Sequence, residues 1–362
     1  MRMKNVFWWW CSAAALLFVP ACGGGNQPAP TPAPGAPSTP AAAESQPQAP
    51  AAKETGAKKP AAPVRIDMEL VKALFTMPPA APAVDNPGTP EKVALGKLLY
   101  HDQSLSKNGN LSCASCHDLK NYGQDGKKTS PGSTGTLGER NTPTVYNAAK
   151  QFAQFWDGRA ATVEEQAIGP VLNPVEHGVA DEAELLAKLQ AKPELVAAFA
   201  KAFPGPESVA VKNFQYAIGA FERTLTTTSK FEDFLAGKAQ LSNEEKLGLK
   251  TYLDVGCQAC HMGSLLGGSM YQKLGVVKPY PTKDEGRAAV TKSDSDKFLF
   301  KVPSLLNCEK TAPYYHDGSI ATLEESVSNM AEYQLGKTLK PEEVASIVTF
   351  LKTLTGPLPE LN

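Results

Sequence analysis

Cys113-Ala114-Ser115-Cys116-His117 is matched in pattern, later in the same chain, by Cys257-Gln258-Ala259-Cys260-His261. Two cysteines at this spacing lie about one helical turn apart, so both thiols can bond to the two vinyl groups of one porphyrin. The histidine that follows the second cysteine is the usual proximal ligand of haem iron. The sequence therefore predicts two covalently bound c-type haems, one on each motif.

Other interpretations of a Cys-x-x-Cys pair are weaker here. The pair also occurs in zinc sites, in thioredoxin-like redox proteins and as a disulfide. Each of these would need a histidine to follow the second cysteine twice by coincidence. Neither copy lies in the strand–helix–strand context of a thioredoxin motif, so haem attachment is the favoured interpretation.

The composition fits a globular protein of two domains. The 362 residues have a formal net charge of −1 and 42% hydrophobic residues, which is enough for two separate cores. Because there is no basic excess, no nucleic-acid partner is expected. Four of the seven cysteines belong to the two motifs, and Cys11 and Cys22 lie in an apolar leader. We expect the remaining one, Cys308, to be a buried free thiol.

The start of the chain has the features of an export signal. Arg2 and Lys4 precede an apolar segment over 6–19, which is too short to require a membrane-spanning helix. Val19-Pro20-Ala21-Cys22-Gly23 resembles a bacterial lipoprotein cleavage box, with Cys22 as the lipidated residue. Proline is unusual in such a box, so ordinary signal-peptidase cleavage is the alternative. Either route predicts export to the periplasm, and the first predicts a membrane tether through Cys22.

We divide the chain into four parts on composition. Residues 1–22 are the predicted signal peptide. Residues 23–63 are rich in proline and alanine with almost no large apolar residue, which predicts a disordered tether. The predicted domains are an N-terminal haem domain over 64–235 and a C-terminal haem domain over 236–362.

Helical patterns dominate the chain after the tether. Thr89-Pro90 predicts a helix start, because threonine caps a first turn and proline fits the first helical position. Ser242-x-x-Glu245 is a capping box that opens the helix before the second haem motif. Apolar residues three and four positions apart predict helices over 211–225 and 344–354. No alternating pattern is long enough to predict a sheet, so the predicted fold class is mainly α, with two tandem cytochrome c-like domains.

An internal repeat supports this division. Asn141-Thr-Pro143-Thr-Val-Tyr-Asn147 is matched by Lys301-Val-Pro303-Ser-Leu-Leu-Asn307. An Asp-Gly pair follows each copy at 157–158 and 317–318, and a Thr-x-x-Glu capping box follows at 162 and 322. The offset is 160 residues throughout, so one ancestral haem module is used twice.

The two halves differ in residues that can bind or attack at the iron. Met330, in the second half, is the candidate sixth ligand of the second haem, and a thioether ligand raises the reduction potential. The alternative is that Met330 only fills the core. In the first half the segment 123–138 contains no histidine and no methionine, which predicts an open sixth position. Glu176 is our candidate acid–base residue there, with a solvated loop carboxylate as the alternative.

From about Asp67 to Pro357 the chain resembles the bacterial di-haem cytochrome c peroxidases, including the methylamine-maturation (MauG-type) branch. The matching segments are both haem motifs, Arg140-Asn141-Thr-Pro-Thr, Phe155-Trp156-Asp157-Gly158-Arg159, Glu165-Gln166-Ala167-x-Gly169-Pro170, Thr311-Ala-Pro313-Tyr-Tyr-His316, and Met330 with Gln334-Leu335-Gly336.

The resemblance implies a role for each matched position. The haem on His117 would be the peroxidatic one, and the haem on His261 and Met330 would receive electrons. Trp156 would lie between the haems as an electron path, and Glu176 would be the acid–base residue with Gln166 nearby. Asn141, with the backbone carbonyls of Thr311 and Pro313, would bind a calcium ion. The family also implies hydrogen peroxide as substrate, a small c-type cytochrome or cupredoxin as donor, and a homodimer.

One segment departs from the family pattern. Many members contain Ser-x-Gly-His-Gly before the arginine, and its histidine blocks the peroxidatic iron until the other haem is reduced. Here residues 130–135 are Ser-Pro-Gly-Ser-Thr-Gly, without histidine. We therefore expect an enzyme that needs no reductive activation. The maturation branch shares that trait but has tyrosine where this chain has Met330, which favours ordinary peroxidase behaviour. A second departure is His177, which is an alternative sixth ligand.

Three functions follow from these patterns. The main hypothesis is a peroxidase that reduces hydrogen peroxide to water. The second is a MauG-like oxidase that acts on a protein partner, and the third is a non-catalytic di-haem electron carrier.

Overall fold

Helices form most of the structure, which is a computed structural model and describes residues 63–360. The predicted signal peptide, most of the tether and Cys22 lie outside the described residues. The α-helices are α1 (Met68–Phe75), α2 (Pro90–His101), α3 (Cys113–Cys116), α4 (Val163–Leu172), α5 (Glu182–Gln190), α6 (Pro193–Ala202), α7 (Val211–Glu222), α8 (Lys230–Leu235), α9 (Asn243–Val255), α10 (Ala288–Thr291), α11 (Leu323–Leu335) and α12 (Pro341–Lys352). Within residues 63–360, no helix combines the length and the apolar character needed to cross a bilayer.

The helix starts follow the predicted capping residues. Thr89 caps α2 by accepting a hydrogen bond from Lys92 N, and Pro90 is the first helical residue. Ser242 and Glu245 form the expected capping box at the start of α9. Thr162 and Thr322 cap α4 and α11 at equivalent positions of the repeat. Each cap satisfies a backbone N–H that the helix itself leaves without a partner.

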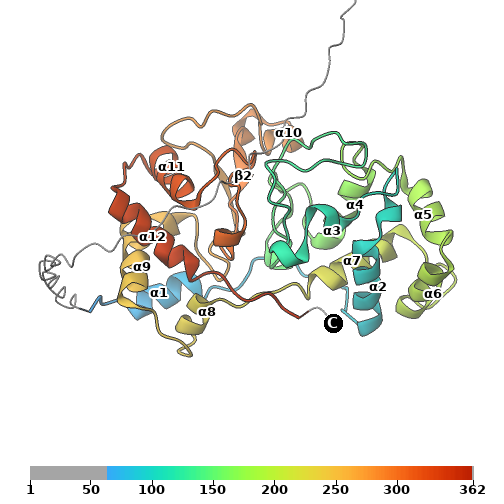
Figure 1. The fold of residues 1–362 in the computed structure, drawn as a ribbon, viewed down its shortest axis with the longest axis horizontal. Helices are drawn as coiled ribbons and strands as arrows, with labels where there is room; N and C mark the ends of the chain where they lie inside the picture. Colours follow the sequence, from blue (N-terminus) through green and yellow to red (C-terminus); the bar gives the residue numbers. More distant parts are fainter. Residues whose placement is uncertain (1–62, 361–362) are drawn as a thin grey trace, which may run out of the picture. The chain divides into compact units, whose positions relative to one another are not determined.

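Two hydrophobic cores form, one in each half of the chain. In the first, α2 packs on α7 around Leu99, Phe214 and Phe221. In the second, α9 packs on α12 around Tyr252 and Phe350. Figure 1 shows α2 to α7 gathered in one half and α9, α11 and α12 in the other.

A glycine lets each of these helix pairs approach closely. A Cβ on Gly96 of α2 would lie 2.0 Å from the backbone oxygen of Ala217 on α7. A Cβ on Gly248 of α9 would lie 2.2 Å from the backbone oxygen of Ser346 on α12. In each half a glycine therefore allows close packing of the helix pair in the core.

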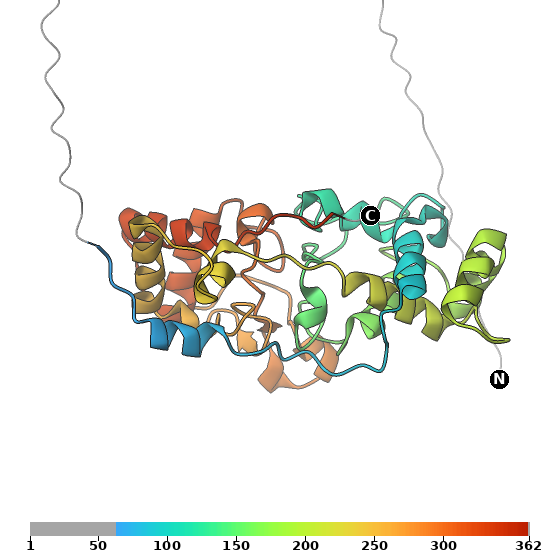
Figure 2. The same cartoon turned by 90° about the horizontal axis from the view of Figure 1, so that it is seen from below.

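The chain crosses between the halves more than once. Val71 and Phe75 of α1 pack in the second core, and residues 76–89 then run across to α2 in the first half (Figure 2). At the other end, Leu358 packs against the first core, and Tyr122 donates a hydrogen bond from its hydroxyl to Gly356 O at 3.1 Å. The domain boundary near residue 235 stays a prediction.

The repeated segments meet at one side chain. Asn147 and Asn307 both adopt left-handed backbone conformations, with φ of 59° and 62°. Their side-chain amides donate to the hydroxyl of Thr227 at 3.0 and 2.9 Å, and all three residues are buried. A single hydroxyl therefore links the two copies of the repeat.

A short antiparallel sheet is present in the second half, where the sequence predicted none. It pairs β1 (Tyr271–Lys273) with β2 (Leu299–Lys301), and Tyr271 lies opposite Lys301. Strands of three residues are too short to give a period-two pattern. The predicted fold class, mainly α with a repeated module, is otherwise confirmed.

Candidate haem and peroxide site

The first haem motif forms a single helical turn. Cys113 and Cys116 are the first and last residues of α3, and Ser112 precedes it with its N–H bonded to Ser115 Oγ at 2.9 Å. His117 ends the turn, and its backbone oxygen accepts a hydrogen bond from Tyr100 Oη at 2.6 Å. The two thiols therefore lie one turn apart, as attachment of one porphyrin requires.

The side chain of His117 is oriented for iron binding. Its Nδ1 lies 3.2 Å from Gly123 O. A carbonyl can only accept, so Nδ1 holds the proton and Nε2 remains as the ligand atom. Burial lowers the pKa of His117, opposed by its hydrogen bonds to backbone carbonyls. The neutral imidazole that a metal requires is therefore the favoured form.

The second motif repeats this geometry. Cys257 begins a 3-10 turn directly after Gly256, whose φ of 101° ends α9. His261 Nδ1 lies 3.2 Å from Leu266 O, and Tyr252 Oη donates to His261 O at 2.8 Å. Burial likewise lowers the pKa of His261. The first motif forms an α-helical turn and the second a 3-10 turn, but in both motifs the histidine Nδ1 faces a backbone carbonyl.

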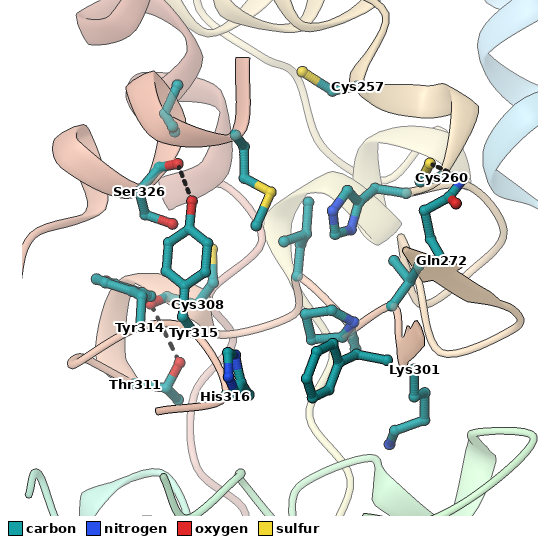
Figure 3. A pocket seen from close by; sticks show the side chains of 18 of the residues that line it. Cys257, Cys260, Gln272, Lys301, Cys308, Thr311, Tyr314, Tyr315, His316 and Ser326 are labelled. Atoms are coloured by element: carbon teal, nitrogen blue, oxygen red, sulfur yellow. Dashed lines mark hydrogen bonds between the residues drawn. The ribbon is translucent and has the colours of Figure 1, made fainter. Parts of the chain in front are cut away.

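A cavity of about 270 Å³ adjoins the second motif. Cys257, Cys260 and His261 line it together with Met330 from α11. Figure 3 shows Cys260 and Gln272 on one side of this pocket and Tyr315 and Ser326 on the other. Among the described residues, the four motif cysteines form no disulfide. Two free thiols, an oriented imidazole and a thioether around one cavity fit a covalently bound haem.

Glu176 lies in a tight turn after α4. Asn173 ends the helix, its carbonyl accepts from Glu176 N at 3.0 Å, and its amide donates to Glu176 Oε1 at 2.8 Å. The side-chain oxygen of Asn173 also accepts from Val175 N at 3.0 Å. The position of the carboxylate is therefore fixed by one asparagine through both its backbone and its side chain.

The surroundings of Glu176 favour a proton-transfer role. Burial raises the pKa of Glu176, while the hydrogen bond from Asn173 and the charge of Arg159 lower it. Burial also raises the pKa of the Cys113 thiol to about 12, with smaller contributions from the charges of Glu222 and Glu176. Glu176 thus lies within electrostatic range of the first haem motif, where a carboxyl group with a raised pKa can exchange protons.

His177 is buried beside the first motif. Only 5% of its surface is exposed, and its Nδ1 has no hydrogen-bond partner within the part of the chain that the structure describes. Burial lowers the pKa of His177 to about 4, against the effect of a hydrogen bond to the Leu105 backbone, and the charge of His117 lowers it further. The ring is therefore neutral at ordinary pH.

The segment 123–138, which contains no histidine and no methionine, is partly buried. Ser133 is only 3% exposed. Its N–H donates to Glu176 O at 2.8 Å, its carbonyl accepts from the side chains of Asn108 and Asn110 at 2.9 and 3.0 Å, and its hydroxyl donates to Asn110 Oδ1 at 2.8 Å. A Cβ on Gly132 would lie 1.8 Å from Val175 O. The segment is thus packed onto the turn that contains Glu176.

Trp156 adjoins the second cavity. Its indole N–H donates to Asn141 O at 2.9 Å, and its ring centroid is 6.5 Å from that of His316. Gln166 lies half-buried on α4, and in the part of the chain that the structure describes no hydrogen bond joins it to Glu176.

Comparisons with known proteins agree with this arrangement. A family model described as di-haem cytochrome c peroxidase matches residues 90–240. The cytochrome c551 peroxidase of Nitrosomonas europaea is 44% identical over 281 residues, covering 76% of this chain and 83% of that protein. The chain belongs to the di-haem cytochrome c peroxidase family. The MauG protein of Methylophilus methylotrophus is 33% identical, covering 78% of this chain and 88% of that protein.

A solved structure is similar in fold as well. It is a MauG-like protein associated with microbial copper homeostasis, with a TM-score of 0.69 and 31% identity, covering 77% of this chain and 93% of that one. Membership of the di-haem family implies two haem c groups, in agreement with the two motifs.

The three predicted calcium ligands, Asn141, Thr311 and Pro313, line the same cavity as the second motif. Asn141 donates from its amide to Lys127 O at 2.9 Å and to Lys128 O at 3.3 Å, which leaves its side-chain oxygen available. Thr311 and Pro313 line the cavity with it. Oxygen donors of this kind suit calcium.

Sequence reasoning missed two groups between the halves. Arg140 donates to Asp157 at 2.5 Å and to both oxygens of Asp284 at 2.6 and 2.8 Å, joining the first half to the second. Lys301 is buried although it is a lysine. The sequence offered one indication of this burial: Lys301 stands between the apolar residues Phe300 and Val302, and a lysine is rarely buried without a partner.

Proposed function

We propose that this chain is a cytochrome c peroxidase that reduces hydrogen peroxide to water. The observation that supports this most is the difference between the two halves. Met330 shares a cavity with His261, whereas Glu176, a carboxyl group with a raised pKa, interacts electrostatically with Cys113 of the first motif. The site with His261 and Met330 is therefore suited to storing an electron, and the site near His117 and Glu176 to transferring a proton.

The C-terminal haem is the proposed electron entry site. Cys257, Cys260, His261 and Met330 would hold it, and a histidine–methionine pair supplies a high potential. Electrons would come one at a time from a small c-type cytochrome or cupredoxin. Trp156 adjoins this cavity and belongs to the first half, so it is the proposed path toward the N-terminal haem.

The N-terminal haem is the proposed peroxide site, held by Cys113, Cys116 and His117. When bound, the iron supplies a binding position and electrons for cleaving the O–O bond. Glu176, ionised, takes the proton of the peroxide oxygen that binds, and then delivers it to the oxygen that leaves as water. Two electrons and two protons convert one peroxide into two waters. Acid–base help of this kind contributes about 10²–10⁴-fold. Gln166 is the proposed neighbour of Glu176 in the pocket.

The enzyme is proposed to be active without prior reduction. In family members that need this step, a histidine lies in the segment that matches 130–135, and this chain has none. The packing of Ser133 against Glu176 O, Asn108 and Asn110 supports the proposal, since it fixes the segment in one position.

Four further features belong to the proposal. The oxygen atoms of Asn141, Thr311 and Pro313 would bind calcium. The leader supports a periplasmic location, and Cys22 a lipid anchor. A homodimer is proposed from the family resemblance alone.

The experiment is stopped-flow turnover of the full chain with both haems, using hydrogen peroxide and a reduced small c-type cytochrome. We expect rapid oxidation of the cytochrome, and loss of turnover in Glu176→Gln with both haems retained. Full activity of that variant would remove Glu176 from the mechanism. A protein with no turnover at all would be the electron carrier, and one that oxidises only a protein partner would be the MauG-like oxidase.

A further inference from the structure

Lys301 is a buried cation at the boundary between the halves. It is the last residue of β2, and its side chain lines the same cavity as His261 and Met330. Only 8% of its surface is exposed. Its backbone N–H donates to Trp156 O at 2.8 Å, which fixes the strand against the first half. Figure 3 shows Lys301 at the edge of the pocket nearest the ribbon of the first half.

The ammonium group of Lys301 has no counter-charge among residues 63–360. Its Nζ donates to the amide oxygen of Gln151, and in residues 63–360 no carboxylate pairs with it. Burial is the only cause that lowers the pKa of Lys301, to about 7. A neutral amide compensates poorly for removing an ammonium ion from water.

Two buried carboxylates in this chain, in contrast, have a counter-charge. Glu164 is 3% exposed and pairs with Arg223 at 2.8 Å. Asp157 is 4% exposed and pairs with Arg140 and Arg159 at 2.5 and 2.9 Å. Lys301 therefore differs from these two paired carboxylates, and it lines the cavity beside the second haem motif.

We propose that Lys301 binds a propionate carboxylate of the C-terminal haem. A haem c group has two propionates, and the second motif that would hold it lines the same cavity as Lys301. The pair would form a charge-assisted hydrogen bond in a water-poor site. This inference rests on the haem assigned to the second motif, and does not depend on peroxidase turnover.

The pairing has an electrostatic consequence. The carboxylate keeps Lys301 protonated, and the ammonium offsets the negative charge beside the iron. Reduction adds one negative charge to the haem, so a nearby cation favours the reduced form. Lys301 is thus a residue that raises the potential of the electron entry site, acting together with Met330.

The test is a potentiometric titration of the full chain with both haems, followed by optical absorption. In Lys301→Met we expect the reduced form of the higher-potential haem to lose at least tenfold in equilibrium stability, which corresponds to 59 mV for a one-electron couple. Lys301→Arg should retain the wild-type potential. Lys273→Met removes the same charge from an exposed position of the same half and should shift the potential by less than a third as much.

Gln151→Leu provides a second, independent variant. If a propionate is the partner, Lys301 stays charged without Gln151 and the potential is retained. If Gln151 is the true partner, the potential falls as in Lys301→Met, which overturns the proposal. An unchanged potential in Lys301→Met, with both haems bound, also overturns it. If Lys301→Met fails to bind the second haem, the Gln151→Leu and Lys301→Arg titrations still decide.

Discussion

Replacing Asn173 by aspartate should move the pH dependence of peroxide turnover. The amide of Asn173 donates to Glu176 Oε1 at 2.8 Å, while its oxygen accepts from Val175 N at 3.0 Å. Aspartate keeps the acceptor and so preserves the turn. It removes the donor and places a second carboxylate against Glu176.

The size of the effect follows from these contacts. A hydrogen bond to a charged group contributes about 1.5–3 kcal/mol. At 1.36 kcal/mol per pKa unit, its loss raises the pKa of Glu176 by about 1–2 units, and repulsion between the carboxylates adds to the rise. Glu176 must be ionised to accept the peroxide proton. The acidic limb of kcat/KM should therefore move to higher pH by at least about 1 unit, with the rate at high pH retained.

The assay is steady-state turnover with peroxide between pH 4 and pH 9, because kcat/KM reports the groups of the free enzyme. Asn243→Asp is the matched control. It lies in the first turn of α9, and its side-chain oxygen accepts from Val64 N at 3.4 Å, a contact that aspartate can retain. Its profile should equal that of the wild type. An acidic limb that stays in place in Asn173→Asp would refute the assignment of that limb to Glu176.

Two predictions concern stability. Thr227→Val should lower the free energy of unfolding by about 2–4 kcal/mol, because two buried amide groups lose their common acceptor. Thr349→Val on α12 should cost under about 0.5 kcal/mol in the same urea titrations, since its hydrogen bond is exposed; equal effects would contradict the link between the repeats. Burial raises the pKa of Glu222 from 4.5 to about 8, with the charge of Glu164 adding to it. A raised pKa gives stability that is full below pH 4.5 and is lost as pH rises toward about 8. Glu222→Gln should therefore flatten thermal stability over that window, and parallel curves for the two proteins would count against a neutral Glu222.

Much of the site could be predicted from local patterns. The two haem motifs, the helix caps at Thr89 and Ser242, and the repeat are encoded within short segments, so that spacing alone identifies them. The family and the mainly α class are confirmed. The roles of Glu176 and Met330 stay proposals, although each lies near the motif to which it was assigned.

The remaining features depend on contacts between distant segments. Ser133 is buried because Asn108, Asn110 and the Glu176 turn surround it, and no local pattern indicates this. Similarly, α1 packs in the second core across more than 150 residues of sequence, beside Phe231. Lys301 is buried at the end of β2, a strand of three residues that is too short to be predicted from the sequence. Composition and periodicity describe a segment and not its partners.

The central claim is that one iron is open to peroxide while the other is saturated by His261 and Met330. Electron paramagnetic resonance of the fully oxidised full-length protein tests this most directly. We expect equal amounts of one high-spin and one low-spin ferric haem before any reductant is added, with the high-spin signal unaffected by Met330→His. Two low-spin haems in the oxidised protein would contradict it.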